Sequence, residues 1–272
     1  MITKKEISGA ILQLGLKDKC VCLHSSMKSF GDEVKGGADD IIDSFLDNGC
    51  TLLVPTFSYN YILRPPENSR PAQNGYDYDN PLPDWGRDLV FLPENDGLSK
   101  SDMGAIPSAV LEYEERIRGN HPICSFTAIG PYAKELVKGQ APMDVYAPLR
   151  ELALFHGFIL LMGVGLNRMT AIHLAEQMAG RNMFIRWANN PQKQVVEAET
   201  GGCSEGFGGL EPYITGLDKR VAVGNSLWRA FDTGMFLKKA ARVIILKPEI
   251  THCGDENCIR CNDAIKGGVV QF

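Results

Sequence analysis

His173 and Glu176 are the side chains of this sequence whose types and spacing point most directly to acid–base chemistry. An apolar run over 158–162 predicts a buried strand, a glycine-containing turn follows it, and Thr170 is expected to cap the next helix. Residues three positions apart share one face of a helix, so the carboxylate could fix the imidazole tautomer and raise its basicity, as a general base requires. The alternative is a histidine that only caps or packs at a helix start.

The elements predicted on either side of this pair alternate between helices and strands along the chain. Open α/β sheets place their sites at strand ends, where this turn is expected. The N-terminal part predicts an amphipathic helix over 3–16 with a Thr3–Glu6 capping box, a strand over 20–24, a helix over 38–48 and a strand over 50–55. Further on we expect helices over 108–118 and 130–138, antiparallel strands within 183–200, a short helix over 210–217, a helix near 232–240 and a final strand over 243–246.

Small polar residues follow the first predicted strand, from Ser25 to Gly31. Backbone N–H groups and hydroxyls in such a loop could hold a phosphate or a pantetheine chain, which predicts a nucleotide or coenzyme cradle. Neither a Walker A loop nor a Gly-x-Gly-x-x-Gly pattern is present. The alternative for Ser25 and Ser26 is an ordinary loop and helix cap.

Residues 58–101 differ from the rest of the chain, because they are rich in Pro, Asn, Asp and Tyr and show no periodicity. A segment of this length inside a compact domain is expected to be either disordered or functional. Its tyrosines, Trp85 and several aspartates favour an ordered lid or substrate loop over a linker.

Composition limits the class of protein. The 272 residues are 44% hydrophobic and 22% charged, with a net charge of −5, and no Lys/Arg cluster is present, which argues against a nucleic-acid partner. No apolar run approaches the ~20 residues that span a bilayer, and the first residues lack the apolar core of a signal peptide. The eight cysteines are then expected to be mostly reduced thiols of a cytoplasmic protein.

Ten short stretches, taken together and in order, resemble the aminoglycoside 3-N-acetyltransferase family, the antibiotic acetyltransferases that are unrelated to the GNAT fold. They are Leu23-His-Ser-Ser-Met27, Gly36-Gly37, Leu53-Val-Pro-Thr-Phe57, Met103-Gly104, Asn120-His-Pro-Ile-Cys-Ser-Phe126, Ala147-Pro-Leu-Arg150, Leu161-Met-Gly-Val-Gly165, Thr170-Ala-Ile-His-Leu-Ala-Glu176, Cys203-Ser-Glu-Gly-Phe207 and Val223-Gly-Asn225. The resemblance implies one three-layer α/β/α domain with a central mixed sheet, over 1–250, followed by a Cys-rich tail over 251–272.

The resemblance also implies a reaction: acetyl-CoA would donate an acetyl group to an amine of an amino sugar. The family's catalytic histidine falls on His173 and its supporting carboxylate on Glu176. Direct attack by the amine needs no nucleophilic cysteine, and Thr170 with nearby backbone N–H groups could stabilise the oxyanion. The expected partner is a small amine, with no nucleic acid and no membrane, and a homodimer remains open.

The coenzyme-binding segments of the family match three parts of this chain. They imply coenzyme contacts for Ser25, Ser26, Met103, Gly104, His121, Ser125 and Phe126, with His121 expected to order its turn. His24 is expected to be structural.

Two features depart from the family pattern. The loop at 60–98 looks long and carries Arg64, Arg70 and Arg87, which could contact phosphates or pair with neighbouring acids. A nucleotide-linked or other biosynthetic amino sugar is therefore an alternative acceptor. Two other hypotheses are a non-catalytic relative that binds CoA or an amino sugar, and an enzyme that uses another acyl donor or hydrolyses acyl-CoA.

The second departure is the C-terminal stretch with His252, Cys253, Cys258 and Cys261, to which Cys203 could be added from upstream. A zinc site would need four ligands folded together, and the alternative is a tail of free thiols. From the sequence we assign no metal ligand.

Overall fold

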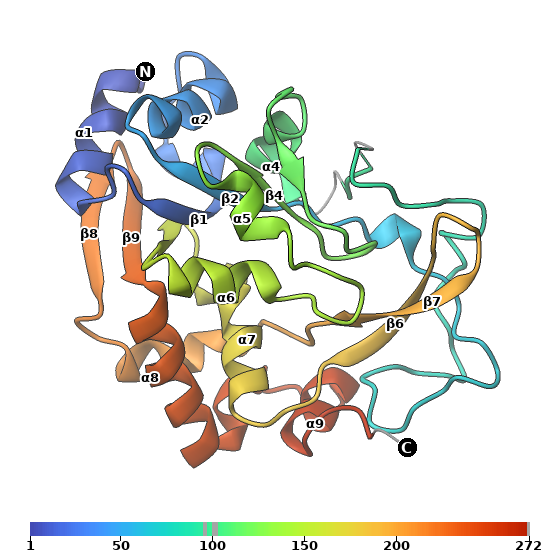
Figure 1. Cartoon of the computed structure of the whole chain (residues 1–272). Helices are drawn as coiled ribbons and strands as arrows, with labels where there is room; N and C mark the ends of the chain where they lie inside the picture. The colour runs from blue at the N-terminus through green and yellow to red at the C-terminus, as the bar shows by residue number, and fades with distance from the viewer. Residues whose placement is uncertain (95–96, 100–102, 271–272) are drawn as a thin grey trace.

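The computed structural model describes residues 1–94, 97–99 and 103–270 (Figure 1). Positions 95 and 96 of the predicted 60–98 loop, and 271 and 272 of the predicted tail, lie outside these ranges. Its centre is a seven-stranded sheet in the order β3-β4-β2-β1-β5-β9-β8. The strands are β1 (Cys20–Ser25), β2 (Thr51–Pro55), β3 (Ile117–Arg118), β4 (Phe126–Ile129), β5 (Phe158–Met162), β8 (Asp218–Val223) and β9 (Ser226–Asp232).

The sheet is mixed, as the resemblance implies. Strand β1 lies at its middle and pairs in parallel with both β2 and β5, with Cys22 opposite Leu53 on one side and Ile159 on the other. The outer pairs β2–β4, β3–β4, β5–β9 and β8–β9 are antiparallel. The carboxyl ends of β1, β2 and β5 therefore meet at one edge of the sheet.

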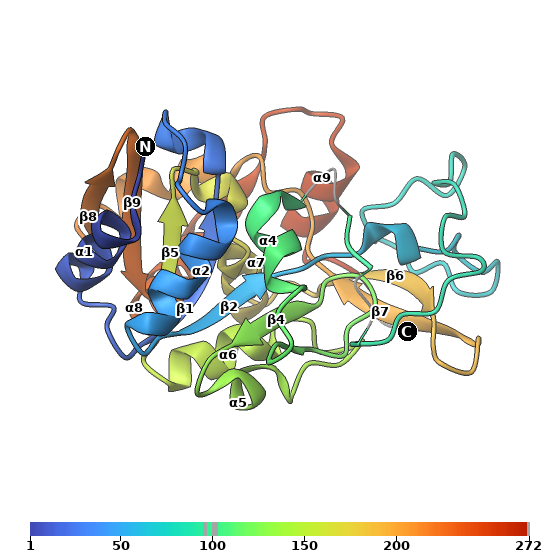
Figure 2. The same cartoon turned by 90° about the horizontal axis from the view of Figure 1, so that it is seen from above.

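Helices cover both faces because the central strands are apolar on both sides. Along β1, Cys20 and Cys22 join one hydrophobic cluster, whereas Val21 and Leu23 join the other, as the two-residue period of a strand requires. One face is covered by α1 (Lys4–Leu14), α2 (Gly37–Asp47) and α4 (Ala105–Val110), and the other by α5 (Ala133–Val137), α6 (Ala147–Leu154), α7 (Ala171–Met178) and α8 (Thr233–Leu246) (Figure 2). The predicted three-layer α/β/α fold is confirmed.

A second, two-stranded sheet projects from the main body and is formed by β6 (Phe184–Asn189) and β7 (Val195–Thr200), which confirms the antiparallel strands expected within 183–200. The 60–98 loop packs on this hairpin (Figure 1). The remaining elements are short: the 3-10 turns η1 (Met27–Phe30), η2 (Tyr59–Tyr61), η3 (Leu166–Arg168), η4 (Phe207–Tyr213) and η5 (Pro248–Thr251), and the helix α9 (Ile259–Ile265).

Local signals predicted some boundaries well and others wrongly. The Thr3–Glu6 capping box at the start of α1 is present. The strand predicted over 243–246 is wrong, because α8 continues to Leu246 and buries an apolar stripe of helical spacing. The hairpin β8–β9 was not expected. The helix predicted over 210–217 is the 3-10 turn η4. The helix predicted over 108–118 is α4, which ends at Val110.

Within the described part of the chain, none of the helices combines the length and the apolar composition needed to cross a membrane.

Candidate functional site

An open cavity of about 1530 Å³ lies at the edge of the sheet where the three central strands end. Its lining includes Ser25 at the end of β1, Pro55 at the end of β2, and Gly163 directly after β5. This is the strand-end position that open α/β sheets use for ligands. The volume exceeds the ~300–1,000 Å³ of a typical small-molecule site, so the cavity has room for two substrates.

His173 lines this cavity from the first turn of α7 and is paired with Glu176. Its Nδ1 lies 2.8 Å from Oε2 of Glu176, and the two residues are only 8% and 5% exposed. A carboxylate only accepts hydrogen bonds, so Nδ1 carries a proton, and in the neutral imidazole Nε2 then holds the lone pair. Within the described ranges no residue is hydrogen-bonded to Nε2, which leaves this nitrogen for a ligand of the cavity.

Aromatic rings and a glycine fix the plane of the imidazole. The Tyr146 ring is stacked with it at 6.2 Å between centroids and an angle of 11°, and Phe207 from η4 packs edge-on at 4.8 Å. Gly201 lies so close that a Cβ there would come within 2.5 Å of Cδ2 of His173. These contacts leave the ring little freedom to turn away from the cavity.

The second oxygen of Glu176 is held by two residues that sequence reasoning missed. Arg181 Nη1 donates to Oε1, and Thr251 Oγ1 donates to the same atom at 2.9 Å. Arg181 also donates to the Thr251 hydroxyl and to the Pro248 carbonyl. Since Arg181 is buried beside the carboxylate, it compensates the charge that Glu176 needs in order to orient His173.

Thr170 lies at the N-cap position of α7, as expected, but its side chain caps no backbone N–H. The backbone of Thr170 is already helical, and its carbonyl accepts the N–H of His173. The residue lines the cavity next to His173. Its hydroxyl is therefore not used by the helix end and can serve a ligand.

Four of the residues expected to contact coenzyme lie on the cavity wall: Ser25, Ser26, Met103 and Gly104. Ser25 ends β1, Ser26 precedes η1, and Gly104 is the N-cap of α4 with a left-handed backbone (φ 81°). Lys28 from η1 lies on the same wall and was not expected, although its position two residues after Ser26 could have suggested it.

His121 is fully buried and does not line the cavity. Its Nδ1 accepts the backbone N–H groups of Ile123 and Cys124, and its Nε2 donates to the carbonyl of Glu199 at 2.9 Å. Burial lowers the pKa of His121 to about 4, so the ring is neutral near pH 7. His121 orders its turn, as expected, and direct contact with a coenzyme is not supported.

Ser125 and Phe126 are likewise fully buried and absent from the cavity wall. Ser125 Oγ donates to the carbonyl of Thr56 and accepts from Nε of Arg118, both at 2.9 Å. Phe126 begins β4 and faces the core shared with Leu53. The expectation that these two side chains touch the coenzyme does not agree with their positions, because Ser125 is held inside by Thr56 and Arg118 and Phe126 packs in the core.

His24 also lines the cavity but is only 7% exposed, and burial lowers its pKa to about 4. Its Nε2 lies 3.7 Å from Sγ of Cys22. A neutral, buried ring in the central strand fits the structural role expected for it.

The 60–98 loop contributes directly to the cavity, through Tyr76, Asp77, Asn80, Leu82 and Trp85 among others. Asn74 anchors the loop to β6, because its side chain bonds both the N–H and the carbonyl of Ile185.

The three arginines of the loop do not line the cavity. Arg87 pairs with Asp84 at 3.0 Å, and Arg70 lies over the ring of Tyr78. Arg186 from β6 instead reaches the cavity, held by the carbonyls of Asn74 and Gly75.

The charged lining is mixed rather than uniformly acidic. Among the residues that the structure describes, the carboxylates are Asp77, Glu205 and Asp255, and the permanent cations are Lys28, Arg168, Arg186 and Arg260. Asp255 and Arg260 come from the C-terminal segment, which folds back onto the cavity instead of trailing away from it. The cavity can therefore bind both anionic and cationic groups.

Comparisons with known proteins agree with this architecture. The chain is 35% identical over 193 residues to aminoglycoside N(3)-acetyltransferase IX of Micromonospora chalcea, a match covering 65% of this chain and 63% of the relative. A solved variant of aminoglycoside acetyltransferase AAC(3)-IVa in complex with gentamicin has a TM-score of 0.75 at 22% identity, over 98% of this chain and 97% of that one. The solved binary complex of AAC-IIIb with CoASH has a TM-score of 0.70 at 18% identity, over 89% and 96%.

The sequence alignments span slightly less than two thirds of the length of the first curated relatives. The sequence model of the aminoglycoside 3-N-acetyltransferase family matches residues 22–235, which is most of the chain and includes the turn, His173 and Glu176. The chain therefore belongs to the aminoglycoside 3-N-acetyltransferase family.

Proposed function

We propose that this protein transfers the acetyl group of acetyl-CoA to an amine of an amino sugar, of the aminoglycoside 3-N type, with His173 as the general base. The observation that carries the proposal is the buried His173–Glu176 pair, whose Nδ1–Oε2 distance of 2.8 Å leaves Nε2 to the cavity. A histidine that only packed would not need a buried carboxylate, itself charge-compensated by Arg181.

The proton inventory of the reaction fits these residues. A sugar amine near pH 7 is mostly protonated, so the ammonium group first releases one proton to water to free its lone pair. As the neutral amine attacks, Nε2 of His173 accepts the second proton that the nitrogen loses. The new C–N bond forms at the thioester carbonyl, and the negative oxygen of the tetrahedral intermediate is offered the Thr170 hydroxyl and backbone N–H groups near the start of α7. The C–S bond then breaks, and the proton on His173 can pass to the departing thiolate.

The wall formed by Ser25, Ser26 and Gly104 is the proposed coenzyme site. Hydroxyls and a left-handed glycine next to Lys28 suit a pantetheine chain and its phosphates. A solved relative of this fold binds CoASH. Phe126 and His121 act indirectly, because Phe126 packs on Phe57 and His121 holds the backbone of Ile123 and Cys124, which line the cavity. Ser125 is buried against Thr56 and Arg118.

The 60–98 loop is the proposed acceptor site, with Asp77 available to a protonated amine and Trp85 and Leu82 to a sugar face. A solved relative binds gentamicin. Arg186 and Arg260 favour a second candidate, an amino sugar that carries a phosphate, because two cations on one wall suit an anionic substituent.

The test is an acetyl-transfer assay over a panel of amines. Acetyl-CoA is incubated with the protein and with 2-deoxystreptamine antibiotics, free amino sugars or nucleotide-linked amino sugars, and both CoA and the acetylated amine are measured by liquid chromatography and mass spectrometry. Direct measurement of CoA is preferable to a thiol reagent, since Cys253 and Cys258 are partly exposed and would react.

Each outcome separates the hypotheses. Turnover with a 2-deoxystreptamine antibiotic supports the proposed function, and turnover confined to nucleotide-linked amino sugars supports the second candidate. CoA release at the same rate without any amine would show a hydrolase instead. Coenzyme binding without turnover across the panel would favour the binding-protein hypothesis.

Gly201→Ala is expected to lower kcat by about 100-fold while leaving the KM for acetyl-CoA within a factor of about three. The added Cβ would come within 2.5 Å of both Cδ2 of His173 and the Tyr146 hydroxyl, so the imidazole must move. Gly208→Ala is the matched control, because a Cβ at Gly208 meets no atom within 4 Å. Equal kcat values for the two variants would show that the position of the ring does not limit turnover.

A further inference from the structure

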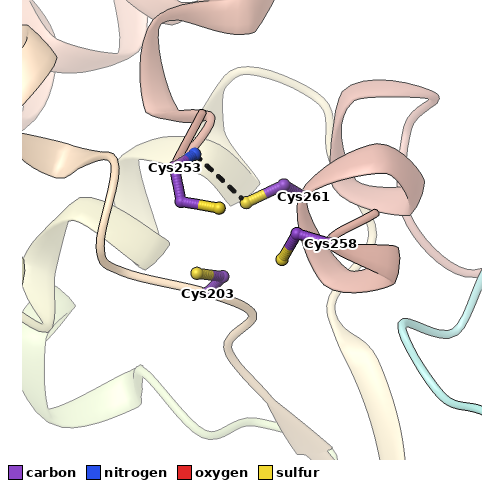
Figure 3. A group of neighbouring side chains, drawn as sticks. All are labelled: Cys203, Cys253, Cys258 and Cys261. Carbon is purple, nitrogen blue, oxygen red and sulfur yellow. Dashed lines mark hydrogen bonds between the residues drawn. The ribbon is translucent and has the colours of Figure 1, made fainter. Parts of the chain in front are cut away.

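Four cysteines that are far apart in the sequence converge beside the cavity. Cys203 lies in the loop after β7, Cys253 follows η5, Cys258 is the N-cap of α9 and Cys261 lies in its first turn. Their sulfur atoms lie within 4.8 Å of one another, and none of them forms a disulfide. Figure 3 shows the four sulfur atoms turned toward one common centre.

This arrangement suits a tetrahedral metal. Zinc binds thiolates at about 2.3 Å, which places four sulfurs of a tetrahedron about 3.8 Å apart, within the spread observed here. Two residues separate Cys258 from Cys261 and four separate Cys253 from Cys258, which are zinc-ligand spacings. The N–H of Cys253 donates to Sγ of Cys261 at 3.4 Å, as expected around a metal-bound thiolate.

The neighbouring histidine is not part of this group. Nδ1 of His252 accepts the N–H of Gly254 at 2.9 Å, and its Nε2 lies 3.2 Å from Oδ1 of Asn262. Four sulfurs complete a zinc coordination shell without it. A shell filled by protein ligands is typical of a structural site rather than a catalytic one.

We propose that Cys203, Cys253, Cys258 and Cys261 bind one structural zinc ion that clamps the C-terminal segment 251–261 onto the loop beside His173. Cys203 is two residues from Gly201, which touches the imidazole, and Thr251 of the clamped segment donates to Glu176. Three of the four ligands lie outside the region matched by the family model, which ends at residue 235.

The C-terminal segment that the proposed zinc ion holds also contacts the acceptor side of the cavity. Asp263 of α9 accepts the N–H of Gly75 at 2.8 Å, and Arg260 between the last two ligands lines the cavity. Loss of the ion should therefore disturb both the support of His173 and the 60–98 loop. The metal site itself stands without the proposed function, whereas its effect on turnover rests on that function.

The test begins with the metal content of the full-length protein, purified from zinc-supplemented cells without a metal-affinity tag. We expect about one zinc per chain by mass spectrometry of the metal, released when the four thiols are titrated with an organomercurial. Replacement by Co²⁺ should give the intense visible bands of a tetrahedral tetrathiolate site. Less than about 0.1 zinc per chain together with four freely titratable thiols would overturn the proposal, and so would a disulfide within the group.

Single cysteine substitutions test which residues bind the zinc ion. Cys258→Ser and Cys203→Ser should each lose most of the zinc and lower the Tm by about 5 °C or more. Cys50→Ser is the matched control, because Cys50 lies outside the group and its contact with the Leu16 carbonyl suits a hydroxyl equally well. Full zinc content in Cys203→Ser would disprove the clamp, since the ion would then hold only the C-terminal segment.

Metal content and the cobalt spectrum do not depend on catalysis, so they decide the metal site even if no amine in the panel is acetylated. If the wild type is active, removing zinc with a chelator should lower kcat by about 10-fold and re-addition should restore it. Unchanged kcat in zinc-free, folded protein would contradict the coupling to His173.

Discussion

Replacing His173 by alanine is expected to lower kcat by about 10²–10⁴-fold, the usual contribution of a positioned general base. The variant should keep its fold, because Glu176 retains the hydrogen bonds from Arg181 and Thr251 that hold it in place. Coenzyme affinity should also remain, since the proposed coenzyme wall at Ser25 and Ser26 belongs to β1 and the residue after it.

The measurement is single-turnover acetyl transfer together with calorimetric titration of CoA. His156→Asn is the matched control, because it removes an exposed imidazole away from the cavity and asparagine tolerates the positive φ of 48° at that position. A His173→Ala variant that turns over within about threefold of the wild type would disprove the assignment of the base.

Replacing Arg181 by methionine is expected to lower the free energy of unfolding by about 3–5 kcal/mol, because it leaves the buried carboxylate of Glu176 without its compensating charge. The same change should lower kcat, since Glu176 then no longer holds His173 in one orientation. Arg181 would act as a positioning residue in this role, because it does not line the cavity.

Chemical denaturation measures the loss in free energy of unfolding. Arg150→Met is the control, since the Arg150–Asp144 pair is partly exposed and its loss should cost about 1 kcal/mol or less. Glu176→Gln should restore much of the stability of Arg181→Met without restoring kcat, because the double variant has no unpaired charge but also no carboxylate. If Arg181→Met lowered the free energy of unfolding equally in the wild type and in Glu176→Gln, Arg181 would act through packing alone.

The sequence could predict the site where its signals are local. A strand, a glycine turn and a helix start lie within twenty residues, so the position of His173 and its carboxylate partner followed from spacing. The mixed sheet and its three layers came from the resemblance to a family, and the two-sided burial of β1 explains why they form.

Partners that meet only in the fold could not be predicted in this way. Thr251 lies 75 positions from Glu176, and Cys203 joins the other three cysteines only because η5 and α9 fold back. A motif match also gives no side-chain direction, which is why Ser125 and Phe126 were expected at the coenzyme and instead point into the interior.

The final-strand error has a related cause. Residues 243–246 are apolar and β-branched in part, which favours a strand when they are taken alone. In the structure Val243 and Ile244 complete a buried stripe begun at Phe236, whereas Ile245 and Leu246 are exposed on the same helix. Packing of α8 against α7 outweighs the local preference of these residues.

The partners of the Thr251–Glu176 hydrogen bond are made at different times during protein synthesis, because they lie far apart in the chain. At ~5–20 residues per second, the 75 positions between them take the ribosome about 4–15 s to translate. During that interval a nascent chain already contains His173 and its carboxylate but not the hydroxyl that steadies it. A translation product that stops before residue 251 would therefore carry the base without its full support.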